Sequence, residues 1–300
     1  MIRQFQDTVI DVYGKEGKKF LYRLPELLKS CASKWSLTEI NEFDNLSYNY
    51  VARAISETNQ EVVLKLGIQS KEFLSEVEAL KLYAGQGCAR LLDYDENLGA
   101  MLLERLAPGT VLSTLKDDDQ ATLVAAKLMS RIKIKEPKEH KFQSLMDWAK
   151  DLENLRKHFG NGMGPFSKEL LERAEINYYY LIDSTKENML LHGDLHHDNI
   201  LSTNKSWKAI DPKGVVGDPV FEPVNYMKNY LLRTNNPKEA LARRIHIFSK
   251  ELGYDKQRLI SWGVAHSVLS ALWSYEDHGE IPQETLICAR LFRDMEKGIC

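Results

Sequence analysis

A change in sequence character about a third of the way along the chain constrains the fold more than any other feature. Two runs rich in β-branched and aromatic residues, 48–55 and 61–68, are separated by the turn residues SETNQ. Two further runs, 89–95 and 100–106, are separated by ENLG. Each pair is typical of an antiparallel hairpin, whereas the rest of the chain has mostly helical spacing. We therefore predict an α+β fold with a small strand-containing N-terminal part and a larger helical part.

Helix signals surround these strands. Residues 70–87 place apolar side chains at helical spacing after Ser70, a potential N-cap, and the pattern stops at the following glycines. We also predict a helix that begins at Pro25, because an apolar stripe continues through segment 24–35. Further helices are expected near 118–132, 142–158, 167–184, 222–231, 237–252, 255–275 and 283–297, with a short strand at 207–211.

Charge and composition exclude several classes of protein. The net charge is −3 and the sequence pI is about 6.3, without the basic excess that nucleic-acid binding requires. The N-terminus has no signal-peptide apolar region, and no window approaches the ~18 apolar residues of a membrane span. The four cysteines form no CxxC pair, so neither zinc nor a disulfide framework is supported. We expect a cytoplasmic monomer or weak dimer that binds neither nucleic acid nor membrane.

The stretch LLHGDLHHDNILS at 190–202 concentrates polar side chains between apolar residues. His192 and His196 have the i, i+4 spacing of a zinc site on a helix, but the glycine between them disfavours that helix. Asp194 and Asn199 lie five residues apart on one loop and suit phosphoryl transfer better. That reaction needs an aspartate near the attacking hydroxyl and oxygen ligands for Mg²⁺.

Further residues extend this pattern. Asp211 ends the apolar strand AID and offers a second oxygen ligand. Lys65, inside the apolar strand VVLKLG, either faces solvent or contacts phosphates, and in the second case it needs an acidic partner. On the helix that follows, Glu76 lies about 60° from the apolar stripe, whereas Glu78 lies nearly opposite it. We therefore predict Glu76 as the partner, with Glu72 as the alternative.

Taken in order, the strand lysine, the helix glutamate, HxDxxxxN and the strand-terminal aspartate resemble the protein-kinase-like fold. HGD and AIDPK are similar to the aminoglycoside phosphotransferases. The segments LHGDLHHDNIL, WKAIDPKGVVGDPVFEP and AHSVLSALWSYEDHG resemble the streptomycin 6-kinase group of aminoglycoside/hydroxyurea antibiotic-resistance kinases. The resemblance covers most of the chain from residue 34. It implies two lobes: residues 1–106 as a nucleotide-binding lobe with an antiparallel sheet and helix, and residues 107–300 as a helical lobe with the catalytic loop and acceptor site.

The resemblance implies an ATP-dependent O-phosphotransferase that uses Mg²⁺ and modifies a hydroxyl of a small, cationic molecule, such as the aminoglycoside streptomycin. Asp194 would orient or deprotonate the hydroxyl, and His196 would reach the γ-phosphate. Asn199 and Asp211 would hold Mg²⁺. Lys65 would contact the α- and β-phosphates and pair with Glu76, and the backbone from Glu104 to Leu106 would meet adenine. Backbone N–H groups of a turn from Ser47 to Asn49 could also cradle phosphate.

Two departures from the family pattern concern phosphate and metal binding. Family members commonly have glycine where Asp198 stands, so an extra carboxylate lies next to Asn199. The segment 45–54 has no glycine, which makes close approach of its backbone to phosphate harder.

The acceptor is least constrained by the sequence. A polycation needs a pocket lined by carboxylates, and the candidates are Asp218, Glu222, Glu276 and Asp277, with Trp273 against a sugar face. Asp218 could instead cap the helix that follows. A kinase acting on an amino sugar or an amino alcohol would use the same residues. A non-catalytic nucleotide-binding module is the alternative from another class, but it would be expected to have lost at least one of the residues Lys65, Asp194, Asn199 and Asp211. The interval DPKGVVGDP leaves little room for the activation loop of a protein kinase.

Overall fold

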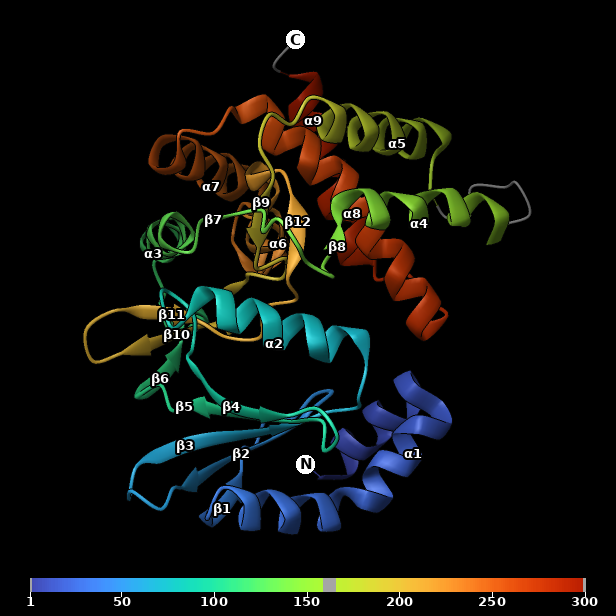
Figure 1. Cartoon of the computed structure of the whole chain (residues 1–300). Helices are drawn as coiled ribbons and strands as arrows, with labels where there is room; N and C mark the ends of the chain where they lie inside the picture. The colour runs from blue at the N-terminus through green and yellow to red at the C-terminus, as the bar shows by residue number, and fades with distance from the viewer. Residues whose placement is uncertain (1, 159–165, 299–300) are drawn as a thin grey trace. The chain divides into compact units, whose positions relative to one another are not determined.

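The computed structural model describes residues 2–158 and 166–298, with the side chains of residues 2, 3, 154–158, 277 and 278 left undescribed. The chain forms two compact units, Met1–Gly109 and Thr110–Cys300 (Figure 1). In the described ranges, no helix is both long enough and apolar enough to cross a membrane.

A five-stranded antiparallel sheet forms the centre of the first unit, with the strand order β1-β2-β3-β5-β4. Its strands are β1 (Thr38–Glu42), β2 (Tyr50–Ile55), β3 (Glu61–Leu66), β4 (Leu91–Asp95) and β5 (Ala100–Glu104). Both predicted hairpins are confirmed, because β2 pairs with β3 and β4 pairs with β5. The sequence did not predict β1, since TEINE is mostly exposed and lacks the apolar alternation of a half-buried strand.

Helix α1 (Ile2–Lys34) covers one face of this sheet (Figure 1). Its buried side chains, including Phe5 and Leu27, share a core with alternate residues of β2 and β3. The prediction that a helix begins at Pro25 is wrong, because α1 continues through Pro25 and is kinked upstream at Gly14 (φ 55°). Proline removes one helical hydrogen bond, and the apolar contacts of α1 outweigh that loss.

Helix α2 (Lys71–Tyr83) covers the opposite face of the sheet (Figure 1). The predicted cap is confirmed, because the Ser70 hydroxyl accepts a hydrogen bond from the Phe73 N–H at 3.2 Å. The helix ends at Ala84, which adopts a left-handed conformation (φ 49°) just before the first glycine. Because side chains alternate across a strand, Lys65 on β3 points toward α2 while its neighbours join the α1 core.

Helices dominate the described part of the second unit. They are α3 (Asp118–Arg131), α4 (Leu145–His158), α5 (Lys168–Asp183), α6 (Val224–Lys228), α7 (Pro237–Leu252), α8 (Lys256–His278) and α9 (Gln283–Lys297). The predicted helices are confirmed, except that the one near 222–231 is shorter. Helix α6 stops at Lys228 because Asn229 is extended and Tyr230 is left-handed (φ 57°).

Helix α8 is the centre of the second unit and packs against α5 and α9. Trp262, Val268 and Leu272 are fully buried. At Gly263, an added Cβ would lie 2.2 Å from the ring of Phe292 on α9, so only glycine allows the two helices to approach this closely.

Short strands in the second unit support the loop between residues 191 and 200. One sheet has the order β11-β10-β6, from β6 (Pro108–Val111), β10 (Ile200–Thr203) and β11 (Trp207–Ala209). The other has the order β7-β9-β12-β8, from β7 (Ile134–Lys135), β8 (Gln143–Ser144), β9 (Met189–Leu191) and β12 (Val215–Gly217). The predicted strand near 207–211 is β11, and the others are too short to leave a periodic pattern.

Candidate active site

Gly193 and His192 determine the path of the loop between β9 and β10. Gly193 is left-handed (φ 78°), and an added Cβ would lie 2.8 Å from Val215 Cγ1, which disfavours any other residue. His192 is buried; its Nε2 donates to the Ile210 carbonyl at 2.8 Å and its Nδ1 accepts from the Asp194 N–H at 3.3 Å. Burial lowers the pKa of His192 to about 4, so the neutral ring braces the loop.

Glu222 holds the same loop from the other side. Its carboxylate accepts the backbone N–H groups of His192 at 2.7 Å and Gly193 at 3.2 Å. The side chain is buried, and burial raises its pKa to about 7 despite these two bonds. Both carboxylate oxygens are thus engaged by the backbone in the interior, and a contact of Glu222 with the acceptor stays a prediction.

Asp194 is oriented by one neutral and one cationic neighbour. Its Oδ1 accepts from Asn225 Nδ2 at 3.2 Å, and its Oδ2 lies 3.6 Å from Lys213 Nζ. The Asp194 side chain is 30% exposed. Burial opposes ionisation, but the positive charge of Lys213 and neighbouring cationic groups outweighs it and holds the pKa of Asp194 below its ordinary value. The carboxylate is therefore available as a hydrogen-bond acceptor near neutral pH.

Asn225 is fixed in turn by the core of the second unit. Its Nδ2 also donates to the Gly193 carbonyl at 3.1 Å, and its Oδ1 accepts from His266 Nε2 at 3.0 Å. The His266 ring stacks on Trp148 and meets the edge of Phe221, with centroids 6.0 and 4.7 Å apart. Burial lowers the pKa of His266 well below its ordinary value, so the ring is neutral. Sequence reasoning missed Asn225, since no short-range spacing connects it with the loop.

Asn199 and Asp211 lie at the same end of the β10–β11 hairpin. The Ile210 N–H donates to the Asn199 carbonyl at 3.0 Å, and Asn199 Nδ2 donates to the Asp194 carbonyl at 2.9 Å. Asp211 adopts a left-handed conformation (φ 58°). One amide oxygen and one carboxylate suit Mg²⁺, which also takes phosphate and water oxygens. Within the described ranges, no cluster of three or more His, Cys, Asp or Glu could hold a metal ion.

His196 and His197 have different surroundings. His196 Nδ1 accepts from the Asp198 N–H at 3.3 Å and caps the short 3₁₀ turn His197–Asn199. His197 is buried and stacks on Tyr226, with ring centroids 3.9 Å apart. Burial lowers the pKa of His197 to about 3. His197 is therefore a neutral core residue.

Asp198 is bound by two hydroxyl groups. Ser113 donates to its Oδ1 at 2.9 Å, and Tyr230 donates to its Oδ2 at 2.8 Å. These bonds connect the loop between β9 and β10 to the turn Leu112–Thr114 and to the segment after α6. The extra carboxylate beside Asn199 is thus engaged in joining parts of the second unit.

Lys65 and Glu76 form an ion pair inside the first unit. Lys65 Nζ lies 2.6 and 2.8 Å from the two Glu76 carboxylate oxygens, and the side chains are only 5% and 12% exposed. Glu78 instead contacts Lys81 at 2.6 Å on the surface. The predicted choice of Glu76 over Glu78 and Glu72 agrees with this pairing, because the buried stripe of α2 sets which side chains face β3.

The segment before β2 approaches the end of β3 closely. An added Cβ at Gly67 would lie 2.4 Å from Asn49 Oδ1, so the Asn49 side chain lies directly over the Gly67 backbone. Ser47 is in irregular structure in the same segment. A larger residue at position 67 would displace the Asn49 side chain.

The backbone from Glu104 to Leu106 already has partners in the first unit. The Glu104 N–H donates to the Arg90 carbonyl at 2.9 Å, and the Glu104 carboxylate accepts the Arg90 N–H at 2.8 Å. The Leu106 carbonyl accepts from Arg105 Nη1 at 2.5 Å. A ligand that used the Leu106 carbonyl would have to share it with Arg105.

Asp218 and Trp273 are packed into the second unit. Asp218 accepts from Arg258 Nε and Trp262 Nε1, both at 2.6 Å, and it is buried. Trp273 Nε1 donates to Asp151 at 3.0 Å. Asp218 thus anchors two helical side chains and Trp273 is engaged by Asp151, and their contact with the acceptor stays a prediction. The remaining candidates lie near the C-terminal end of α8, where Glu276 is exposed and the side chain of Asp277 falls outside the described set.

A cavity of about 370 Å³ lies beside Asp194 in the second unit. Asp194 and His196 are on its wall together with residues of α6, of the segment after α6, of α8 and of α9. Other lining residues include Asn225, Lys228, Asn229, Tyr230, Arg233, Ser270, Glu284, Thr285 and Cys288. Among the predicted acceptor residues whose side chains are described, Asp218, Glu222, Trp273 and Glu276 do not line this cavity.

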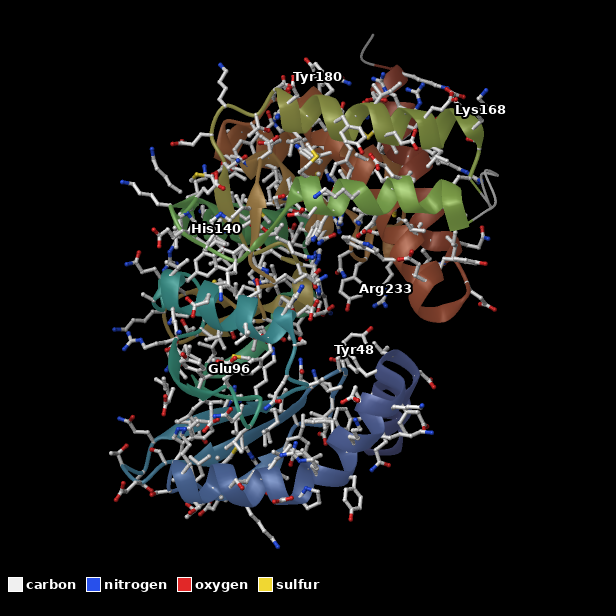
Figure 2. The ribbon with its side chains drawn as sticks, turned by 45° about the vertical axis from the view of Figure 1, so that its right-hand side comes forward. Tyr48, Glu96, His140, Lys168, Tyr180 and Arg233 are labelled. Atoms are coloured by element: carbon white, nitrogen blue, oxygen red, sulfur yellow. The ribbon has the colours of Figure 1, made fainter. Side chains whose placement is uncertain are left out.

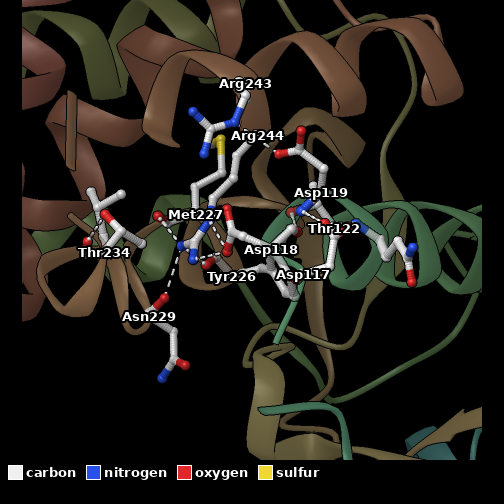
Figure 3. A network of polar contacts seen from close by, with 12 residues as sticks. Asp117, Asp118, Asp119, Thr122, Tyr226, Met227, Asn229, Thr234, Arg243 and Arg244 are labelled. Carbon is white, nitrogen blue, oxygen red and sulfur yellow. Dashed lines mark hydrogen bonds and ion pairs between the residues drawn. The ribbon is translucent and has the colours of Figure 1, made fainter. Parts of the chain in front are cut away.

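The wall formed by α6 is held by Arg244, as Figure 3 shows. Arg244 is 1% exposed and pairs with Asp118 through Nε and Nη2, with the closest contact at 2.5 Å. Its Nη1 donates to the carbonyls of Met227 at 3.0 Å and Asn229 at 2.8 Å. The cation thereby binds the C-terminal carbonyls of α6, where the helix dipole favours positive charge.

Comparisons with known proteins point to one family. The family model described as aminoglycoside/hydroxyurea antibiotic resistance kinase matches residues 34–278. The chain is 28% identical to streptomycin 6-kinase of Streptomyces glaucescens, over 88% of this chain and 87% of that protein. It is also 28% identical to hydroxyurea phosphotransferase of Kitasatospora aureofaciens, over 89% of this chain and 78% of that protein.

The fold agrees with a solved structure as well. The structure of a thermostable mutant of aminoglycoside phosphotransferase APH(4)-Ia, with ADP and hygromycin B, aligns with a TM-score of 0.63 at 14% identity. The alignment covers 88% of this chain and 97% of that one. The predicted α+β, protein-kinase-like fold class is confirmed.

Proposed function

The chain belongs to the aminoglycoside/hydroxyurea antibiotic resistance kinase family, and from this membership we propose that it transfers the γ-phosphoryl group of ATP to a hydroxyl group of a small antibiotic. Streptomycin is the first candidate acceptor and hydroxyurea the second, because relatives carry these names. In this proposal, residues 1–106 bind the nucleotide and residues 107–300 contain the catalytic loop and the acceptor site.

The position of the Asp194 carboxylate carries the proposal. It lies on the wall of a cavity, with Asn225 fixing one oxygen and Lys213 near the other. An acceptor hydroxyl in the cavity would donate to Asp194, and its oxygen would attack the γ-phosphorus. The bond from that phosphorus to the bridging oxygen of ADP breaks, and the hydroxyl proton passes to Asp194. Because such transition states are largely dissociative, orienting the hydroxyl is most of the work of this carboxylate.

Oxygen donors and cations would hold the phosphates. Asn199 and Asp211 would bind Mg²⁺, which when bound neutralises charge on the phosphate oxygens. His196 would reach the γ-phosphate, and Lys65, oriented by Glu76, would contact the α- and β-phosphates. The remaining nucleotide contacts are proposed for Ser47 and Asn49 at phosphate and for the backbone of Glu104 and Leu106 at adenine.

An acceptor panel tests the proposal. ADP release would be measured with streptomycin, hydroxyurea, other aminoglycosides and amino sugars, and the phosphorylated oxygen identified by phosphorus NMR. Asp194→Asn should lower kcat by at least about 10², with ATP affinity within a few-fold and an unchanged melting temperature. Asp119→Asn, at a half-exposed surface ion pair, is the matched control.

Two results would contradict this assignment. A wild-type kcat for Asp194→Asn with a lowered melting temperature would reduce Asp194 to a structural residue. Absence of ATP turnover by the wild-type protein with every acceptor would instead favour a non-catalytic nucleotide-binding module.

A further inference from the structure

The cavity beside Asp194 has a charge balance that differs from a polycation site. Its charged residues, among those described, include the carboxylates of Asp194 and Glu284 and the cations Lys228 and Arg233. A pocket that recognises a polycation is expected to present carboxylates, because like charges placed together are costly. The presence of Lys228 and Arg233 therefore suggests that they face a part of the acceptor that carries no positive charge.

Lys228 is the cation best placed to form a hydrogen bond with the acceptor. It ends α6, is half-buried, and its Nζ donates to Ser270 Oγ at 2.7 Å. No carboxylate of the described side chains forms an ion pair with it. An ammonium has three donor hydrogens, so donors remain for a ligand in the cavity. Burial, only partly offset by Asp194 and Cys288, lowers the pKa of Lys228 to about 8.

The backbone around Lys228 is fixed. Arg244 binds the carbonyls of Met227 and Asn229, the residues on either side of Lys228 (Figure 3). The main chain at Lys228 is therefore held in place, and the bond from Lys228 Nζ to Ser270 Oγ holds the side chain at the cavity wall.

The rest of the cavity places its charges differently. Arg233, labelled in Figure 2, lies 4.1 Å over the ring of Tyr230, whose hydroxyl is held by Asp198. Glu284, in the first turn of α9, is exposed. A cationic group in this cavity would be attracted by the carboxylates of Glu284 and Asp194 and repelled by Lys228.

We propose, building on the phosphotransferase function, that Lys228 determines acceptor specificity by donating a hydrogen bond to an uncharged or anionic oxygen of the acceptor and by excluding cationic groups from its side of the cavity. The Glu284 carboxylate would instead attract a cationic group of the acceptor. Acceptors whose reacting ring carries cations on both sides of the hydroxyl should bind more weakly than uncharged, oxygen-rich acceptors of similar size.

Calorimetric dissociation constants test this proposal without requiring turnover. Streptomycin serves as the cationic probe, and hydroxyurea and an uncharged cyclitol serve as the neutral probes. Lys228→Met should change the ratio of affinities by at least about tenfold in favour of streptomycin, and Lys228→Glu should change it further. Glu284→Gln should change the ratio in the opposite direction. Lys168→Met, on the exposed start of α5 (Figure 2), should leave both affinities unchanged.

The outcomes separate this inference from the proposed function. Equal losses of affinity for cationic and neutral probes in both Lys228 variants, with unchanged melting temperatures, would overturn the role of Lys228. If the wild-type protein turns over ATP but the Lys228 variants do not change the ratio of affinities, the phosphotransferase function stands and the role of Lys228 is refuted. If the variants change the ratio but the wild-type protein never turns over ATP, the role of Lys228 stands and the phosphotransferase function is refuted.

Discussion

Replacing Lys65 by methionine should destabilise the first unit by about 3–5 kcal/mol. The Lys65 and Glu76 side chains are 5% and 12% exposed, and Lys65 Nζ lies 2.6 and 2.8 Å from the two Glu76 oxygens. Methionine nearly conserves the length of lysine. The loss therefore comes mainly from leaving the Glu76 carboxylate in the interior without the ammonium that faces it.

Two further variants test whether the destabilisation by Lys65→Met comes from the burial of the ion pair. Removing both charges, as Lys65→Met with Glu76→Leu, should be at least about 1 kcal/mol less destabilising than the sum of the single changes. The matched control is Lys81→Met, because Lys81 pairs with Glu78 at the same 2.6 Å but with side chains 39% and 56% exposed. That exposed pair should contribute at most about 1 kcal/mol.

Hydrogen exchange of the β3 and α2 amides is the appropriate assay. A chain with two compact units need not unfold in a single step, and exchange reports the opening free energy of each element separately. Equal small effects of Lys65→Met and Lys81→Met, or a double variant as unstable as the sum, would refute the reasoning. ATP affinity measured on the same variants then tests the proposed role of Lys65 at the phosphates.

Three other outcomes are expected. Turnover should require Mg²⁺ or Mn²⁺ and should persist after zinc is chelated. Asn199→Ala and Asp211→Ala should each raise the Mg²⁺ concentration that gives half-maximal activity. Turnover with zinc alone would support a histidine metal site instead. Asn225→Ala should lower kcat by about 10- to 100-fold with little change in KM for ATP, and an equal rise in KM would speak against a positioning role. The raised pKa of Glu222, about 7, means that the folded protein keeps a proton that the unfolded chain releases at lower pH. The unfolding free energy should therefore fall as the pH rises from about 4.5 to about 7, by up to about 3 kcal/mol, and Glu222→Gln should remove this part of the pH dependence.

Sequence reasoning succeeded where local chemistry is decisive. The hairpins of β2 with β3 and β4 with β5 follow from alternating apolar residues around short turns. Helix α2 follows from its apolar stripe and its Ser70 cap, and that stripe alone selects Glu76 over Glu78 as the partner of Lys65. These features depend on residues close together in the chain, so periodicity and capping suffice.

The environment of Asp194 depended on the tertiary structure. Asn225, the residue bonded to its Oδ1, is 31 positions away in the chain, and no motif connects the two. Asn225 is oriented by His266, and α6 is held by Arg244, through contacts between helices remote in sequence. Such contacts exist only once the helices have packed.

The residues predicted for the acceptor show a second limit of sequence reasoning, because residue type does not reveal burial. Asp218, Glu222 and Trp273 have the chemistry of a cation and sugar site, yet folding turns the two carboxylates inward, toward Arg258 and toward backbone N–H groups. Residue type determined which reactions this protein could support, and the order of its motifs determined the fold class. Only the packed structure decided which carboxylates are buried, because burial depends on the partners that distant segments bring.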